Sequence, residues 1–536
     1  MRTKLQQSMD MSDNSRPVST VDSSRELMQA LQRPHAFPHP VSTFQLLETH
    51  ISWVLLTGDF AYKFKKPVDL GFANFSTLER RRRFCEEEIR LNARLAPDIY
   101  LDCRAVTGTF ENPTIGGDGD VLEYCVCMRQ FPQDQLLSNL AANGTLGKQE
   151  IDQLVQTVSK FHLEIPKAPQ STDFGSPEAV SQALFENFAS LKRVPELRDS
   201  TQLSEMEHWC RQEVAGRFDL LRLRKEQGFV RECHGDMHLG NMVLLDGRVT
   251  IFDGIDFNAE LRWIDVMSEL AFCMMDLIHQ ERPDLAWRFL NGCLRSSGDY
   301  NGLAVLPLYL VYRALVRAKV AAIRMAPLDV QSAQRETSFQ ELISYLKLAD
   351  RLIHRGKPFL AITHGLSGSG KSYGAEQLSE RTESVWIRSD VERKRRGKAA
   401  SEQPSAPAPQ SDLYTTETTL RVYSQLGRIA ESIVGAGYPV IVDATFLARS
   451  QRDSFREIAR QLNVPFLLID FPTDADVCRE RIRKRSQQQP SDPSDATVDV
   501  FEHQLRAQDP LTREELEIRI PFDSVETTCH QISQLV

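Results

Sequence analysis

The chain has 536 residues, of which 41% are hydrophobic and 26% charged, and its net charge is −9. This length exceeds what one hydrophobic core usually serves, so we expect two or three domains, and the acidic balance argues against a general nucleic-acid-binding protein. The ten cysteines are scattered, and no amino-terminal secretory pattern is present, which favours a cytoplasmic protein with reduced thiols. The most apolar run, Leu303–Val316, contains Arg313 and is too short for a membrane span.

The amino-terminal part begins with residues 1–24, which are polar and which we expect to be disordered. Ser76 and Glu79 form a capping box for a predicted helix, which Pro97 ends. Helical periodicity then dominates from Lys148 onward. Three apolar runs in this part have the length and composition of strands: Ile51–Leu56, Phe60–Lys65 and Val121–Met128.

Strands followed by a long helical stretch predict a bilobal α+β domain over residues 25–350, with a linker at 351–357. Residues 358–536 alternate short apolar runs with helical segments, which is typical of an α/β domain with a parallel sheet. Residues 397–411 are rich in Ala, Pro, Ser and Gln, and we expect a disordered insertion there. The expected strands of the second domain are Phe359–Thr363, Val385–Arg388, Val440–Asp443 and Phe466–Asp470.

The first chemical motif runs from His234 to Asn241, reads HGDMHLGN, and precedes Phe-Asp-Gly at 252–254. Phosphoryl transfer needs neutralised charge, held metal ions and a carboxylate aimed at the acceptor hydroxyl. The spacing is that of a kinase catalytic loop, so we expect Asp236 to orient the acceptor. Asn241 and Asp253 are the expected Mg²⁺ ligands, with Asp256 as a rival to Asp253. The plain alternative is an ordinary turn.

With these motifs, the sequence from about Phe44 to Asp350 resembles the aminoglycoside phosphotransferase and choline kinase superfamily. It is most similar to a bacterial family that fuses such a domain to a P-loop kinase domain. The shared text is AYK at 61–63, LN at 91–92 and RWID at 262–265. The resemblance implies a protein-kinase-like fold, ATP and Mg²⁺ as cofactors, and an anchoring role for Asp265.

The phosphate-binding lysine of such a fold should lie on the strand before the capped helix. Ala61, Lys63 and Lys65 share one face of that strand; Lys63 matches the expected position best, and Lys65 is its rival. Glu88 lies nearest the centre of the helix's apolar stripe and is the predicted partner, unless it is an ordinary solvated glutamate. Since no G-x-G-x-x-G loop precedes Lys63, phosphate clamping on this side is left unexplained.

The second motif, GLSGSGKS at 365–372, fits the pattern G-x-x-x-x-G-K-[ST] between an apolar strand and a helix. Backbone N–H groups of the loop are predicted to surround the phosphates, Lys371 to bridge the β- and γ-phosphates, and Ser372 to ligate Mg²⁺. Asp443 ends a strand that resembles a Walker B strand and would support the metal. The predicted ATP-binding residues are Gly365, Leu366, Ser367, Gly368, Ser369, Gly370, Lys371 and Ser372.

Two further pairs of residues follow the loop. Asp390 and Arg393 resemble the D-x-x-R of polynucleotide 5′-kinases and zeta-toxin-type kinases, which implies a general base and a residue that grips the acceptor. Arg481 and Arg485 lie four residues apart on a basic helix that resembles the mobile lid of small P-loop kinases. The alternative for both lid arginines is a solvated helix face.

These motifs predict a bifunctional ATP-dependent phosphotransferase that acts on hydroxyl groups of small polar acceptors, with one Mg-ATP site per domain. In a second hypothesis, the first domain senses nucleotide and regulates a single P-loop kinase, which acts on a small molecule or a nucleic-acid 5′-hydroxyl. In a third, the chain is an ATP-switched interaction protein. The sequence leaves both acceptors, the oligomeric state and any coupling of the two sites open.

Overall fold

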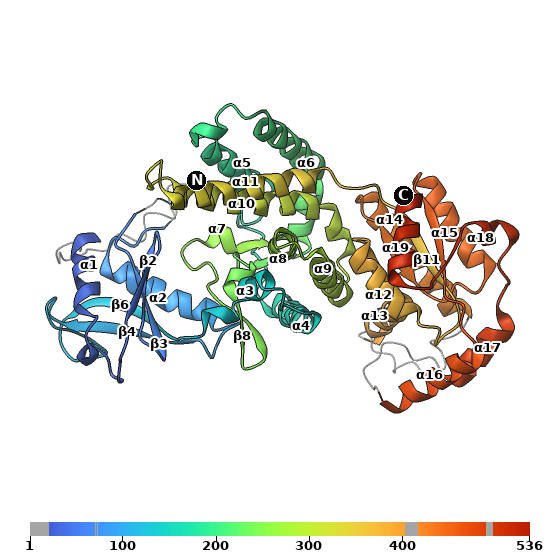
Figure 1. The fold of residues 1–536 in the computed structure, drawn as a ribbon, viewed down its shortest axis with the longest axis horizontal. Coiled ribbons are helices and arrows are strands. Elements are labelled where there is room, and N and C mark those ends of the chain that lie inside the picture. The colour runs from blue at the N-terminus through green and yellow to red at the C-terminus, as the bar shows by residue number, and fades with distance from the viewer. Residues whose placement is uncertain (1–20, 70, 72, 402–415, 489–496) are drawn as a thin grey trace. The chain divides into compact units, whose positions relative to one another are not determined.

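The computed structural model describes residues 21–69, 71, 73–401, 416–488 and 497–536, and the chain divides into two compact units (Figure 1). The first unit comprises Met1–Leu136, His234–Asp236 and Thr250–Arg262. The second comprises Leu137–Cys233, Met237–Val249 and Trp263–Val536.

The first unit is built on a six-stranded antiparallel sheet with the order β1-β2-β3-β6-β4-β5. Helix α2 (Leu78–Asn92) contacts β4 and β6. The short helices η1 (Pro34–Ala36), η2 (Gln133–Gln135) and α7 (Ala259–Arg262) also belong to this unit. The strands are β1 (Gln45–Glu48), β2 (Ser52–Leu56), β3 (Phe60–Lys65), β4 (Tyr100–Gly108), β5 (Pro113–Ile115) and β6 (Val121–Arg129).

Two local features of this unit differ from the expectations. Helix α1 (Val21–Ala30) occupies part of the segment expected to be disordered, and its Leu27 joins the core beside the sheet. Residues 1–20 lie outside the described residues. The amino-terminal cap of α2 is Thr77, whose hydroxyl accepts from Arg80 N. Ser76 is not the cap, because its hydroxyl donates to Asn74 Oδ1 instead.

The second unit begins with a helical part. Helix α8 is buried along almost its whole length, and α10 contacts both α8 and α11. Two pairs of short strands, β7 with β10 and β8 with β9, accompany the helices. The helices are α3 (Leu137–Ala142), α4 (Lys148–Glu164), α5 (Pro177–Leu191), η3 (Pro195–Leu197), α6 (Thr201–Glu226), η4 (Leu239–Asn241), α8 (Val266–His279), α9 (Pro283–Ser297), η5 (Tyr300–Ala304), α10 (Leu306–Met325) and α11 (Ala333–Ile353). The strands are β7 (Val230–Glu232), β8 (Met242–Leu245), β9 (Arg248–Ile251) and β10 (Trp263–Asp265). The last two residues of β9 belong to the first unit.

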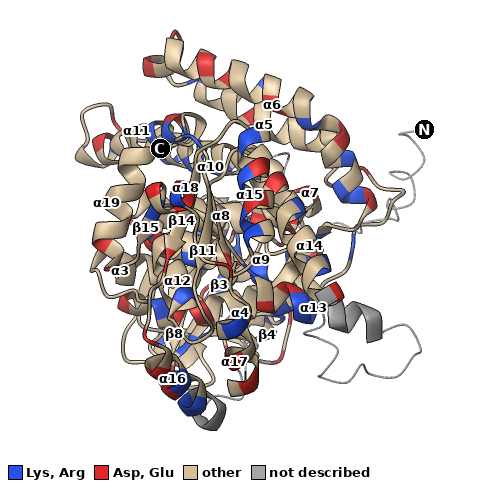
Figure 2. Cartoon of the chain, turned by 90° about the vertical axis from the view of Figure 1, so that its right-hand side faces the viewer, with Lys and Arg blue, Asp and Glu red and all other residues tan. Residues whose placement is uncertain are grey.

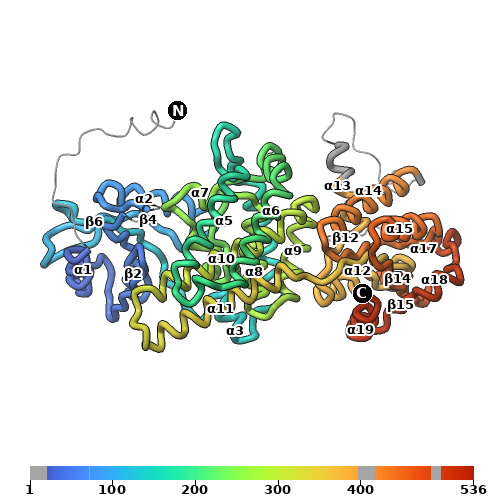
Figure 3. Tube along the Cα trace, turned by 90° about the horizontal axis from the view of Figure 1, so that it is seen from above, coloured from blue at the N-terminus to red at the C-terminus, as the bar shows by residue number. Residues whose placement is uncertain are grey.

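The second unit ends with a five-stranded parallel sheet of order β12-β13-β11-β14-β15. Helices α12 and α19 pack together beside this sheet, as do α14 and α15 (Figure 3). The strands are β11 (Leu360–His364), β12 (Val385–Arg388), β13 (Val440–Asp443), β14 (Phe466–Asp470) and β15 (Arg519–Pro521). The helices are α12 (Lys371–Arg381), α13 (Ser389–Ser401), α14 (Thr416–Gly435), α15 (Arg449–Gln461), α16 (Ala475–Gln488), α17 (Val498–Ala507), α18 (Arg513–Glu517) and α19 (Val525–Leu535).

An antiparallel sheet and a helical part followed by a parallel α/β sheet confirm the expected fold class. The central strands β11 and β13 are buried along almost their whole length, as their largely apolar sequence requires. Of the expected insertion at 397–411, residues 397–401 continue α13, and the rest lies outside the described residues.

The cysteine thiols and the apolar character of the helices can be compared with what the composition led us to expect. All ten cysteines are free, and only Cys103 and Cys529 are partly exposed. In the described part of the chain, none of the helices has both the length and the apolar character that a bilayer span requires.

Candidate active sites

In the first unit, a buried charge cluster joins β3 to α2. Lys63 Nζ donates to Glu88 Oε1 at 2.7 Å, and Lys65 Nζ lies 2.5 Å from Glu88 Oε2. Glu88 is fully buried, so it is not the solvated glutamate of the alternative reading. The alternating pleat of β3 puts both lysines on one face, and the helix presents Glu88 to that face.

Asp253 and Asp256 complete this cluster. Asp253 Oδ1 accepts from Lys63 at 2.6 Å, and Asp256 Oδ2 accepts from Lys65 at 2.6 Å. The Asp253 side chain is 47% exposed, whereas those of Lys65 and Asp256 are 1% and 5% exposed. The Lys63–Asp253 pair can therefore meet a ligand from solvent, while the Lys65–Asp256 pair is enclosed. This contrast favours Lys63 and Asp253 over their rivals.

The charges of this cluster stabilise one another. Burial by itself would raise the pKa of Glu88, but Lys63 and Lys65 outweigh it and lower that pKa to about 2. Burial opposes a charged lysine, yet Asp253 and Glu88 hold the pKa of Lys63 well above its ordinary range. For Asp256 burial prevails over the attraction of Lys65, and its pKa is raised.

The Asp253 backbone has a left-handed conformation, with φ of 61°. Two side chains that the sequence analysis did not single out hold this turn. The N–H of Asp253 donates to Tyr100 Oη at 3.0 Å, and the N–H of Gly254 donates to Asn92 Oδ1 at 2.7 Å. Asn92 belongs to the dipeptide LN at 91–92 that the family resemblance shares, and this resemblance was the only indication in the sequence that Asn92 has a role.

The expected catalytic loop begins in the first unit. His234 Nε2 lies 2.9 Å from Phe252 O, which ties the loop to the residue before Asp253. The N–H of Asp236 donates to His234 Nδ1 at 3.3 Å. Gly235 has φ of 87°, and a β-carbon there would lie 2.7 Å from Leu261 O, so the turn before Asp236 requires glycine.

Asn241 and Asp265 lie in the second unit. Asn241 is buried at the end of η4, where its N–H donates to His238 O at 2.9 Å. Asp265 is also buried; it caps α8 by accepting from Met267 N at 2.8 Å, and both of its oxygens accept from Arg224. These contacts fit the anchoring role that the family resemblance implies for Asp265.

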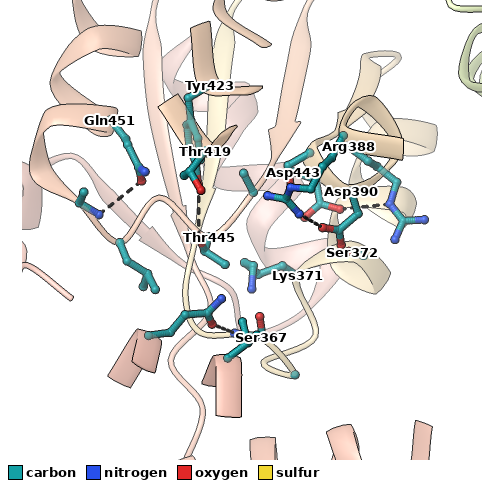
Figure 4. Close-up of a pocket in the computed structure, with 18 of the residues that line it drawn as sticks. Ser367, Lys371, Ser372, Arg388, Asp390, Thr419, Tyr423, Asp443, Thr445 and Gln451 are labelled. Atoms are coloured by element: carbon teal, nitrogen blue, oxygen red, sulfur yellow. Dashed lines mark hydrogen bonds and ion pairs between the residues drawn. The ribbon is translucent and has the colours of Figure 1, made fainter. Parts of the chain in front are cut away.

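In the second unit, the glycine-rich loop joins β11 to α12 (Figure 4). Lys371 Nζ donates to Leu366 O at 2.7 Å, so its side chain folds back over the loop. Gly370, the residue before α12, has φ of 97°, which disfavours any residue with a β-carbon. The loop therefore lies between a strand and a helix, as its sequence predicts.

Asp443 ends β13 beside this loop. It is buried, and burial raises the pKa of its carboxyl group, while Arg388 and a hydrogen bond with Ser372 oppose that rise. Arg388 Nε lies 3.6 Å from Asp443 Oδ2. A hydroxyl and a carboxylate next to each other are hard oxygen donors of the kind that Mg²⁺ prefers.

A cavity of about 860 Å³ lies over the loop, and α13 reaches into its wall. Both Asp390 and Arg393 line it, with Arg393 Nη1 2.9 Å from Asp390 Oδ1. Arg481, from the basic helix α16 (Figure 2), also lines the cavity and donates to Gly368 O at 3.3 Å. Arg485 lies on the same helix, but its side chain is outside the described part of the structure.

The cavity also contains residues that the sequence analysis missed. Tyr423 Oη lies 3.3 Å from Thr445 Oγ1 (Figure 4). Gln504 Oε1 accepts from Ser367 N at 3.1 Å. Further lining residues of this kind are Arg388, Thr419, Gln451 and His503. They lie on elements scattered along the sequence, and none belongs to a recognisable motif.

Comparison with known proteins finds similarity to one protein family, to an uncharacterized relative and to solved structures of kinases. Residues 360–511 match the family model described as an AAA domain. An uncharacterized protein of Mycobacterium tuberculosis is 29% identical over 466 residues, which cover 86% of this chain and 90% of that protein. An APS kinase of Mycobacterium tuberculosis, solved with AMPPNP and APS, covers 34% of this chain and 98% of its own at 16% identity, with a TM-score of 0.25. An ethanolamine kinase of Plasmodium vivax covers 58% of this chain and 82% of its own at 10% identity, with a TM-score of 0.33.

Proposed function

We propose that the chain is a bifunctional ATP-dependent phosphotransferase, with one Mg-ATP site in each kinase-like part and hydroxyl groups of small polar molecules as acceptors. The observation that carries this proposal is the P-loop cavity, where Lys371, Asp443 and Asp390 line one space. A phosphate-binding cation, a metal-supporting acid and a second acid are the groups that phosphoryl transfer requires.

At the P-loop site, the loop N–H groups and Lys371 would bind the β- and γ-phosphates, with Ser372 and Asp443 as the residues that hold Mg²⁺. The metal supplies charge neutralisation at the phosphates when it is bound. Asp390 orients the acceptor hydroxyl and accepts its proton, while Arg393 and Arg481 add positive charge around the transferred group. Arg485 is proposed for the same role from its place on α16.

At the first site, Lys63 binds phosphate and Glu88 holds Lys63 in place. Asp253 and Asn241 are the proposed Mg²⁺ ligands, because both offer oxygen donors and the Asp253 carboxylate is the open one of the two aspartates in its cluster. Asp236 orients the acceptor. The direct Lys63–Asp253 contact supports this assignment, since it puts the phosphate-binding cation beside the metal ligand.

The acceptor of the P-loop site should be small and polar. The cavity volume of about 860 Å³ falls within the usual range for small-molecule sites. Its wall beyond the loop offers hydroxyl and amide groups from Thr419, Tyr423, Thr445 and Gln451. The arginines beside them are not an open basic patch for nucleic acid, because Arg393 is paired with Asp390 and Arg388 faces Asp443.

Nucleotide titration tests the two-site claim. A fluorescent ATP analogue with Mg²⁺ should bind the full chain at two sites, and Lys371→Ala should remove one of them. The double variant Lys63→Ala, Lys371→Ala should bind none, while Lys347→Ala, at an exposed position of α11, should keep both. Loss of all binding in Lys371→Ala alone would contradict the proposal.

Transfer of labelled phosphate to a metabolite pool tests the two activities. Asp236→Asn and Asp390→Asn should each abolish a different product, because loss of an oriented catalytic acid typically costs about 10²–10⁴-fold in rate. If Asp236→Asn leaves every product unchanged, the nucleotide-sensing hypothesis for the first site replaces this one.

A further inference from the structure

Helix α13 presents two charged pairs on opposite sides. Asp390 and Arg393 line the P-loop cavity. Glu392 lies two residues after Asp390, and Arg395 lies two residues after Arg393. Each step corresponds to a rotation of about 200° around the helix. They form an ion pair of their own, and neither lines the cavity.

Glu392 is 1% exposed and is held from several directions. Besides Arg395, Tyr300 Oη donates to its Oε1 at 3.2 Å, and Gln425 Nε2 donates to its Oε2 at 3.3 Å. A buried carboxylate is costly unless such donors surround it. The donors therefore fix where this face of α13 can lie, and through the rigid helix they fix Asp390 as well.

Tyr300 directly follows a residue of a buried ionic network in the helical part of the second unit. Its neighbour Asp299 accepts from Arg224 at 2.8 Å, and Arg224 also pairs with Asp265 at 2.6 Å. All four of these residues are buried. The hydroxyl that reaches α13 thus comes from η5, whose capping residue Asp299 shares Arg224 with Asp265, the cap of α8.

The helical part of the second unit also holds β12, the strand that leads into α13. β12 is an edge strand of the parallel sheet, and Asn291 of α9 pairs with its backbone. Asn291 Nδ2 donates to Ser384 O at 3.0 Å, and the N–H of Trp386 donates to Asn291 Oδ1 at 2.9 Å. The contact of α9 with β12 and α12 can be followed in Figure 3.

We propose that Tyr300 and Asn291 are positioning residues for the P-loop site, which hold the β12–α13 segment so that Asp390 and Arg393 face the acceptor. The inference rests on the proposed function for the role of Asp390. It adds that α9 and η5 complete the P-loop site, so the helical part and the parallel-sheet part of the second unit are coupled in structure and not merely joined.

Hydrogen exchange in the full chain tests the inference first. Tyr300→Phe keeps the ring and removes only the hydroxyl, so peptides from residues 385–395 should exchange about tenfold faster, the ratio expected when a charged group loses one hydrogen bond. Peptides from 365–375 should be unchanged. Ser432→Ala is the matched control, because it removes an exposed hydrogen bond between the same parts of the unit, Ser432 Oγ to Asn301 Oδ1.

Steady-state kinetics then separate positioning from stability. The assay uses the acceptor whose phosphorylation is lost in Asp390→Asn. With it, Tyr300→Phe should lower kcat about tenfold and leave KM for ATP unchanged. Unchanged kcat overturns the positioning role, as does equal acceleration of exchange in both peptides. If the parent chain transfers no phosphate at the P-loop site, the proposed function fails, and exchange in 385–395 decides the structural claim alone.

Discussion

Glu88→Gln should destabilise the first unit in a pH-dependent way. In the folded chain the pKa of Glu88 is lowered from its ordinary value of 4.5 to about 2. At about 1.4 kcal/mol for each tenfold change in an ionisation constant, its ionised form contributes about 3 kcal/mol. Because the folded pKa is the lower one, this contribution is complete above about pH 5.5 and is lost as the pH falls towards 2.

The assay is urea unfolding of the full chain, read by hydrogen exchange in peptides from β3 and α2. At pH 7 the variant should lose about 3 kcal/mol. By pH 3 its deficit should shrink by about 2 kcal/mol, because Glu88 of the parent is then protonated in the unfolded state but still mostly ionised in the folded state. Glu86→Gln is the control, since Glu86 is exposed and pairs with the equally exposed Arg82; it should cost under about 0.5 kcal/mol. A deficit below about 1 kcal/mol at pH 7, or one that does not vary with pH, would refute the reasoning.

Two further predictions concern the second unit. Gly370→Ala should weaken nucleotide binding at the P-loop about tenfold, because a left-handed φ of 97° costs an alanine about 1–2 kcal/mol. The control is Gly356→Ala, whose added β-carbon meets open space and which should show no change in a nucleotide titration. Equal nucleotide affinities of the two variants would contradict the claim. Arg224→Ala should lower the unfolding free energy by about 3–5 kcal/mol, since it leaves two buried aspartates unpaired. Urea denaturation measures this, with the exposed Arg222→Ala as its control, and a loss no larger than that of the control would be the contrary result.

The sequence was most informative where chemistry restricts the backbone. A P-loop needs glycine and lysine at fixed positions, so β11, its loop and α12 could be placed from the motif alone. The strand pleat and the helix period likewise put Lys63 and Glu88 on facing surfaces. Long-range packing could not be read in this way. Tyr100 supports the turn at Asp253 from a distant strand, and Tyr423 reaches the P-loop cavity from α14, because tertiary packing and not local pattern brings these hydroxyls to the sites.

The free thiols have a practical consequence. Cys103 lies in the first unit and Cys529 in the second, and the other eight cysteines are buried. A hydrogen bond with Cys85 lowers the pKa of Cys103, whereas burial raises that of Cys529, so Cys103 should react first with an alkylating label. Sequential attachment of two spin labels to the native chain would then report the separation of the units during turnover, without any engineered cysteine.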